Sequence, residues 1–164
     1  MDIALYHSIS HGIRSHPDSR HELIVHSLRG PTYAALFLLV PNFVLAGWCF
    51  WMLMALYVVD LAISILDFAI ERRSREFLGG LPSGEYVLHI LIAMCFGALV
   101  AASFFEGHQW TVQSTRLVYE PAAVPALLRV LMAIMALIVL YSSAQDLIAA
   151  VRLKGKPHRA SPTA

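Results

Sequence analysis

The chain has 164 residues, of which 58% are hydrophobic and 14% are charged, and its formal net charge is +1. Soluble proteins carry about 25% charged residues, and disordered chains combine low hydrophobicity with high charge, so this composition excludes a disordered protein. The small net charge and the lack of a basic run argue against binding of nucleic acid. We therefore expect one integral membrane domain.

Residues 1–19 form a polar, histidine-rich segment that we expect in the cytoplasm. Its apolar residues recur at helical spacing, and these are Ile3, Tyr6, Ile9 and Ile13. This spacing predicts a short helix that lies on the membrane surface.

Four apolar segments follow, and each is long enough to cross the bilayer core as a helix, which takes about 20 residues. We expect spans at about 23–46, 48–71, 85–105 and 122–151. They lie within a transmembrane domain of residues 20–153, which precedes a cytoplasmic tail of residues 154–164. The first two spans meet at a tight turn at residues 46–47, and the predicted fold is an all-α, up-down-up-down bundle of four transmembrane helices.

Local signals define the first span. Ser19 followed by Glu22 is a capping-box pattern, which predicts that a helix begins near Arg20. Proline lacks the N–H that a helix interior needs, so Pro31 and Pro41 are expected to kink this helix.

The basic residues predict the orientation of the spans. Ten of the 12 lysines and arginines fall in the amino-terminal segment, in the connection after the second span and in the carboxy-terminal tail. Cytoplasmic loops are enriched in Lys and Arg, so we expect both termini in the cytoplasm and the protein in a bacterial-type inner membrane. The tryptophans Trp48, Trp51 and Trp110 then fall near the outer interface, as an aromatic belt does.

Polar side chains recur at helical spacing within the apolar spans, where such groups are rare and usually functional. They are Glu22, His26, Arg29, Tyr33, Tyr57, Asp60, Ser64, Asp67, Glu71, Glu85, His89 and Asp146. The predicted topology places most of them at a similar depth in the cytoplasmic half of the membrane, whereas Asp60 lies midway along the second span.

One interpretation of this cluster is a metal or haem site used for redox chemistry or metal handling, since imidazole and carboxylate ligands suit Fe, Zn or Mn. Candidate metal ligands are Glu22, His26, Asp67, Glu71, Glu85, His89 and Asp146. In a bundle, His26 and His89 would ligate one haem b from diagonal helices, while Arg29 would offset carboxylate charge and Tyr33 would donate a hydrogen bond.

Two other interpretations remain open. The first is proton-coupled transport through a path of Tyr57, Asp60, Ser64 and Asp67, because a carboxylate near the bilayer centre is a candidate proton site. In the second, the polar groups satisfy one another: Arg29 pairs with Asp67 or Glu71, and His26 bonds Glu85.

In that case the protein is a non-catalytic accessory subunit, with other membrane subunits or a homo-oligomer as partners beside the lipid bilayer. The chain contains no Walker loop, Rossmann glycine fingerprint or hydrolase motif, so the sequence predicts no particular reaction.

Overall fold

The computed structural model describes residues 19–74, 83–121 and 124–154. Its elements in chain order are α1 (Arg20–Leu39), β1 (Phe43–Ala46), α2 (Trp48–Ser74), α3 (Ser83–Gly107), the 3₁₀ turn η5 (His108–Trp110), β2 (Arg116–Tyr119) and α4 (Ala126–Arg152). The four expected helices are present in these residues, and α2, α3 and α4 are long and apolar enough to cross a membrane. The surface helix expected before Ser19 lies outside the described residues.

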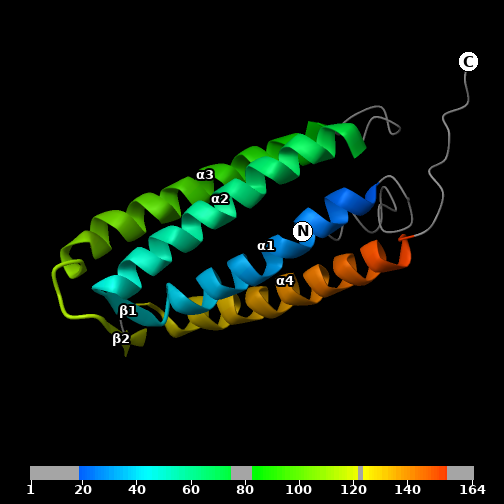
Figure 1. Cartoon of the computed structure of the whole chain (residues 1–164). Helices are drawn as coiled ribbons and strands as arrows, with labels where there is room; N and C mark the ends of the chain where they lie inside the picture. Colours follow the sequence, from blue (N-terminus) through cyan, green and yellow to red (C-terminus); the bar gives the residue numbers. More distant parts are fainter. Residues whose placement is uncertain (1–18, 75–82, 122–123, 155–164) are drawn as a thin grey trace, which may run out of the picture.

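Consecutive helices run in opposite directions, and the small sheet of β1 and β2 closes one end of the molecule (Figure 1). Helix α1 packs along α4 on one side and against α2 on the other, while α3 packs on α2. Most side chains of α3 are exposed, whereas α1 buries residues along its whole length. The centre of the structure is therefore α1, and α3 lies at its margin.

The helix α1 ends earlier than the sequence predicts. We expected a first span to residue 46, but α1 stops at Leu39 because Pro41 follows and cannot continue a helix. Residues Phe43–Ala46 then form an antiparallel pair with Arg116–Tyr119, with Phe43 opposite Tyr119. The start at Arg20 agrees with the prediction, although Ser19 makes no side-chain capping hydrogen bond.

A second correction concerns the turn between β1 and α2. Gly47 has a φ of 57°, which L-residues rarely adopt, and its N–H donates to the carbonyl of Trp110 at 2.9 Å. A Cβ atom at Gly47 would lie 2.7 Å from Thr115 Oγ1. We expected a tight hairpin between the first two spans. The structure instead places the strand β1 and a turn at Gly47 between α1 and α2, and the turn contacts the segment after α3.

The contact between α1 and α4 depends on small residues. A Cβ atom built at Gly30 of α1 would lie only 2.3 Å from Ser143 Cβ of α4, so any larger residue forces the helices apart. Ala34 on α1 and Ala136 on α4 are buried as well. Small residues at a helix contact let the backbones approach closely, which is how helices associate in lipid.

Pro31 leaves one backbone carbonyl of α1 without its usual hydrogen-bond donor, and α4 supplies another donor. A helix normally bonds the N–H of residue 31 to the carbonyl of Ser27, but proline has no N–H. The hydroxyl of Ser143 donates to this Ser27 carbonyl instead. An unsatisfied carbonyl is costly where water is absent, so Ser143 both fits the Gly30 contact and completes the backbone bonding of α1.

Because the Ser143 hydroxyl replaces the N–H that Pro31 lacks, a variant that restores this N–H should tolerate the loss of the hydroxyl. Ser143→Ala should lower the free energy of unfolding by about 1 kcal/mol, since it removes a net hydrogen bond. Pro31→Ala restores the missing N–H, so Ser143→Ala should cost much less in that background. Thermal unfolding of the two single variants and the double variant in detergent measures the coupling. Equal costs of Ser143→Ala in both backgrounds would contradict the assignment.

Candidate functional site

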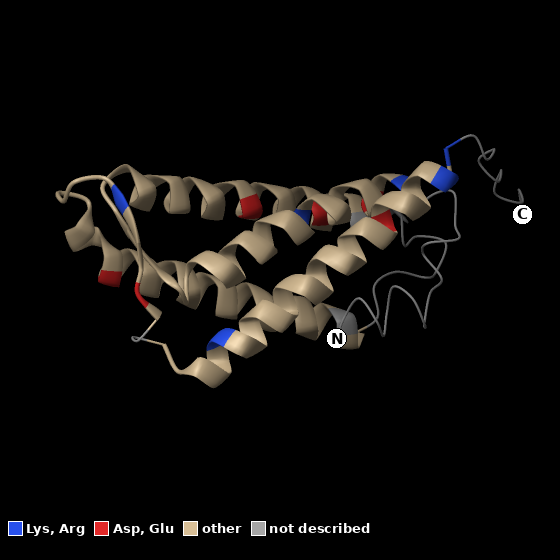
Figure 2. Ribbon diagram, turned by 90° about the horizontal axis from the view of Figure 1, so that it is seen from below, with Lys and Arg blue, Asp and Glu red and all other residues tan. Residues whose placement is uncertain are grey.

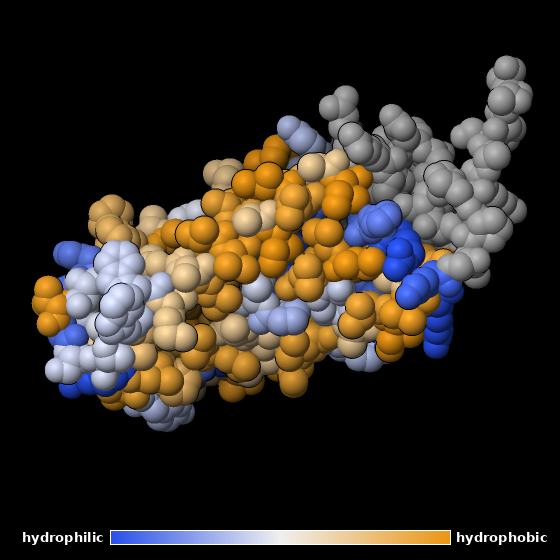
Figure 3. Space-filling model, viewed as in Figure 1, coloured by the Kyte–Doolittle hydropathy of each residue, from blue (hydrophilic) through white to orange (hydrophobic). Residues whose placement is uncertain are grey.

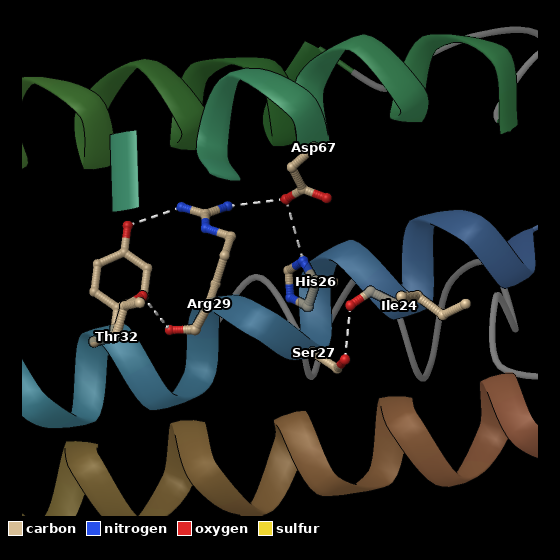
Figure 4. Close-up of polar contacts among 7 residues, drawn as sticks. Ile24, His26, Ser27, Arg29, Thr32 and Asp67 are labelled. Atoms are coloured by element: carbon tan, nitrogen blue, oxygen red, sulfur yellow. Dashed lines mark hydrogen bonds and ion pairs between the residues drawn. The ribbon is translucent and has the colours of Figure 1, made fainter. Parts of the chain in front are cut away.

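A buried ion pair joins α1 to α2. The Nη1 atom of Arg29 donates to Oδ2 of Asp67 at 3.0 Å, and Nδ1 of His26 lies 3.3 Å from the same oxygen. His26 and Arg29 are three residues apart on α1, which places both on the face toward α2 (Figure 4). The side chains of Arg29 and Asp67 are only 12% and 7% exposed.

The guanidinium of Arg29 is held from a second side. Its Nη2 atom donates to the hydroxyl of Tyr33 at 2.8 Å, and its Cζ atom lies 5.2 Å from the centre of the Tyr33 ring. The Tyr33 ring also packs edge-on against Phe96 of α3, with 6.4 Å between centroids. Arg29 is therefore fixed between one carboxylate and one aromatic ring, with its charge offset by Asp67.

A second polar contact between the same helices lies nearer the start of α2. Thr32 Oγ1 is 2.5 Å from Oδ1 of Asp60 and 2.9 Å from the carbonyl oxygen of Arg29. Asp60 is 0% exposed. Beyond it, the hydroxyls of Tyr57 and Ser103 are 2.8 Å apart and join α2 to α3. These polar side chains of α2 thus form hydrogen bonds to the neighbouring helices α1 and α3.

A cavity of about 510 Å³ lies between α1, α2 and α3. Its walls are mainly apolar, with the aromatic rings of Phe68, Phe96 and Phe104 among them. Four polar side chains line it, and these are Arg29, Tyr33, Ser64 and His89. The ring of His89 lies 5.1 Å from that of Phe68.

The candidate metal ligands are distributed over several parts of the structure. Glu22 on α1 and Asp146 on α4 are buried, at 1% and 0% exposure. His26 contacts Asp67, whereas His89 lines the cavity. Among the residues that the structure describes, no group of three or more His, Cys, Asp or Glu side chains is arranged to hold a metal ion. The side chains of the other two candidates, Glu71 and Glu85, lie outside the described part.

The expected proton path is likewise divided. Asp60 bonds Thr32, Asp67 bonds Arg29 and His26, and Tyr57 bonds Ser103. Ser64 lines the cavity. Within the described ranges no hydrogen bond joins Tyr57, Asp60, Ser64 and Asp67 to one another.

The sequence offered Asp67 or Glu71 as the partner of Arg29, and the structure shows a pair with Asp67. His26 also contacts Asp67, while the side chain of Glu85, the partner that the sequence suggested for His26, lies outside the described residues. Sequence reasoning missed Thr32 and Ser143. The signal for Thr32 is its place one turn after Arg29 on the polar face, and the signal for Ser143 is the proline in the facing helix.

Comparison with known proteins finds no family model, no curated protein and no solved structure that matches this chain.

The buried pair predicts a specific pattern of stability. Asp67→Ala leaves Arg29 buried without its carboxylate and should lower the free energy of unfolding by about 3 kcal/mol. Replacing both groups, as Arg29→Met with Asp67→Leu, should recover most of that loss because no unpaired charge remains. Detergent unfolding curves of both variants measure the difference. A double variant no more stable than Asp67→Ala would contradict this account.

Proposed function

We propose that this chain is an integral membrane protein that crosses a bacterial-type inner membrane with all four helices. The length and hydropathy of α2, α3 and α4 support this. So does the surface: a wide apolar band lies between more hydrophilic ends (Figure 3). Although α1 carries several polar side chains, it packs between α2 and α4 and directs His26, Arg29 and Thr32 to partners on α2.

The distribution of charge supports an orientation with both termini in the cytoplasm. Arg20, Arg152 and Lys154 lie where α1 begins and α4 ends, at the end of the molecule away from the sheet (Figure 2). Trp48 and Trp110 lie beside the sheet, at the opposite end. Lys and Arg favour the cytoplasmic side and Trp the interfaces.

A reporter fusion tests this topology. A fluorescent protein that matures only in the cytoplasm, fused after Ala164, should be bright, and alkaline phosphatase at the same position should be inactive. Insertion of the phosphatase in the loop at Gln113, between α3 and β2, should give the reverse result. An active phosphatase at the carboxy terminus would overturn the proposed orientation.

We further propose that the cavity binds an uncharged, lipid-soluble molecule with a hydrogen-bond acceptor on a ring, the chemical class of the isoprenoid quinones. The observation that carries this is the cavity itself: about 510 Å³, mainly apolar and lined at one place by Arg29 and Tyr33. Small-molecule sites have volumes of roughly 300–1,000 Å³ and combine apolar walls with a few polar groups.

The polar groups favour a neutral acceptor over an anion. The charge of Arg29 is already offset by Asp67, so an anionic ligand would have to compete with a buried carboxylate. The Tyr33 hydroxyl accepts from Arg29, which leaves its own hydrogen available to donate. A carbonyl oxygen on a ring that stacks among Phe68, Phe96 and Phe104 would accept that hydrogen bond.

Filling the cavity tests the proposal. Gly97 lines the cavity, and a Cβ atom there meets nothing within 4 Å, so Gly97→Phe places a ring in the ligand space without a clash at its base. A short-chain ubiquinone analogue at 100 times its dissociation constant should stabilise the wild type by about 2.7 kcal/mol and raise its unfolding midpoint by roughly 5 °C or more. Gly97→Phe should abolish that rise.

The neighbouring residue provides a matched control. Ala98 is exposed on the same helix and does not line the cavity, so Ala98→Phe should leave the stabilisation by the quinone unchanged. An equal response in both variants, or no response in the wild type, would contradict a quinone site. A Soret absorption band, or stoichiometric Fe, Zn or Mn, in the purified wild type would favour the metal or haem interpretation instead.

A further inference from the structure

We propose that Asp60 is a proton-binding site in the middle of α2, and that at neutral pH its carboxyl group carries a proton which it donates to Thr32. This site is separate from the cavity, which Asp60 does not line. The inference therefore stands or falls independently of the cavity's ligand.

The contacts of Thr32 need more hydrogens than its hydroxyl has. Thr32 Oγ1 lies within bonding distance of two oxygens: Oδ1 of Asp60 at 2.5 Å and the carbonyl of Arg29 at 2.9 Å. A hydroxyl has one hydrogen to donate, and a backbone carbonyl has none. A single hydrogen shared between two acceptors makes only a weak bifurcated bond, so both contacts are full hydrogen bonds only if Thr32 donates to the Arg29 carbonyl and Asp60 donates to Thr32. That requires a protonated carboxyl group.

The surroundings of Asp60 also favour the neutral acid. The residue is 0% exposed, and its Oδ2 atom has no hydrogen-bond partner in the described part of the chain. An ionised carboxylate buried with so little support would be very costly. The positive charge of Arg29 on α1 attracts the Asp60 carboxyl group. However, both Nη atoms of Arg29 bond other residues, Asp67 and Tyr33. A neutral acid needs no counter-ion, which fits this position.

Asp67 provides the internal contrast. It lies two helical turns further along α2, accepts from Arg29 and contacts His26. These contacts stabilise the ionised form, so α2 carries one charged and one neutral aspartate at the same helix interface. The two titratable tyrosines nearby, Tyr33 on α1 and Tyr57 on α2, bond Arg29 and Ser103 rather than Asp60.

A neutral acid at mid-depth in a span is a group that can release and take up a proton inside the membrane. Loss of the proton would leave a carboxylate with a single donor, Thr32, at the contact between α1 and α2. Protonation of Asp60 thereby stabilises that contact.

A lipid-soluble carbodiimide tests the protonation state of Asp60. The carboxyl group adds across one C=N bond of the reagent: its proton moves to nitrogen and its oxygen bonds the central carbon. The resulting O-acylisourea rearranges to a stable N-acylurea, with no other reactant consumed. In proteoliposomes of the full chain at neutral pH, the peptide that contains Asp60 should gain the mass of one reagent molecule. Asp60→Asn should remove this label, whereas Asp67→Asn should retain it.

Infrared spectroscopy tests the protonation of Asp60 without requiring a reagent to reach this buried residue. The wild type at neutral pH should show the C=O stretch of a protonated carboxyl group, with a component that is lost in Asp60→Asn and retained in Asp67→Asn. Asparagine can still donate to Thr32, so this variant should fold. If Asp60→Asn does not fold, the wild type itself can be used. Loss of the infrared band after the carbodiimide has labelled Asp60 would then assign the band to Asp60. A wild type without such a band, or a band of unchanged intensity in folded Asp60→Asn, overturns the proposal.

Discussion

The partners that polar groups of α1 find on α2 and α4 govern this structure. This helix carries a proline in its interior and polar side chains on the face toward α2, yet it lies between two other helices. Its needs are met from both sides: Ser143 of α4 donates to the carbonyl that Pro31 leaves unbonded, and Asp67 of α2 accepts from Arg29. The positions of α2 and α4 follow from these partners and from the close contact at Gly30.

The helix α3 is held by a different kind of contact, and this leaves room for a ligand. It meets the rest through the Tyr57–Ser103 hydrogen bond and the ring of Phe96, which packs against Tyr33 and Tyr57. The cavity lies beside these contacts, and its lining on α3 runs from His89 to Phe104. Tyr33, which bonds Arg29, therefore also belongs to the polar wall of the proposed binding site.

The two buried aspartates of α2 show why a list of charged residues is a weak guide to function. Asp60 and Asp67 are the same residue type on the same helix, seven positions apart. Asp67 meets a guanidinium and an imidazole, whereas Asp60 meets a hydroxyl that already has a backbone acceptor. Their proposed protonation states differ because their partners on α1 differ, which spacing alone does not reveal.

The sequence by itself determined the four helices and the start of α1 at Arg20, because hydropathy and helical spacing are local properties. It limited the partner of Arg29 to Asp67 or Glu71, and the tertiary structure pairs Arg29 with Asp67. Only the tertiary structure decided that Phe43–Ala46 pairs with Arg116–Tyr119, since strand pairing joins segments about 70 residues apart. It also decided the partners of His26 and Thr32, the place of His89 in a cavity wall and the margin position of α3. These features depend on how each helix is rotated about its axis. The sequence pattern of a polar stripe is the same whichever neighbouring helix the stripe faces, so the pattern does not reveal the rotation.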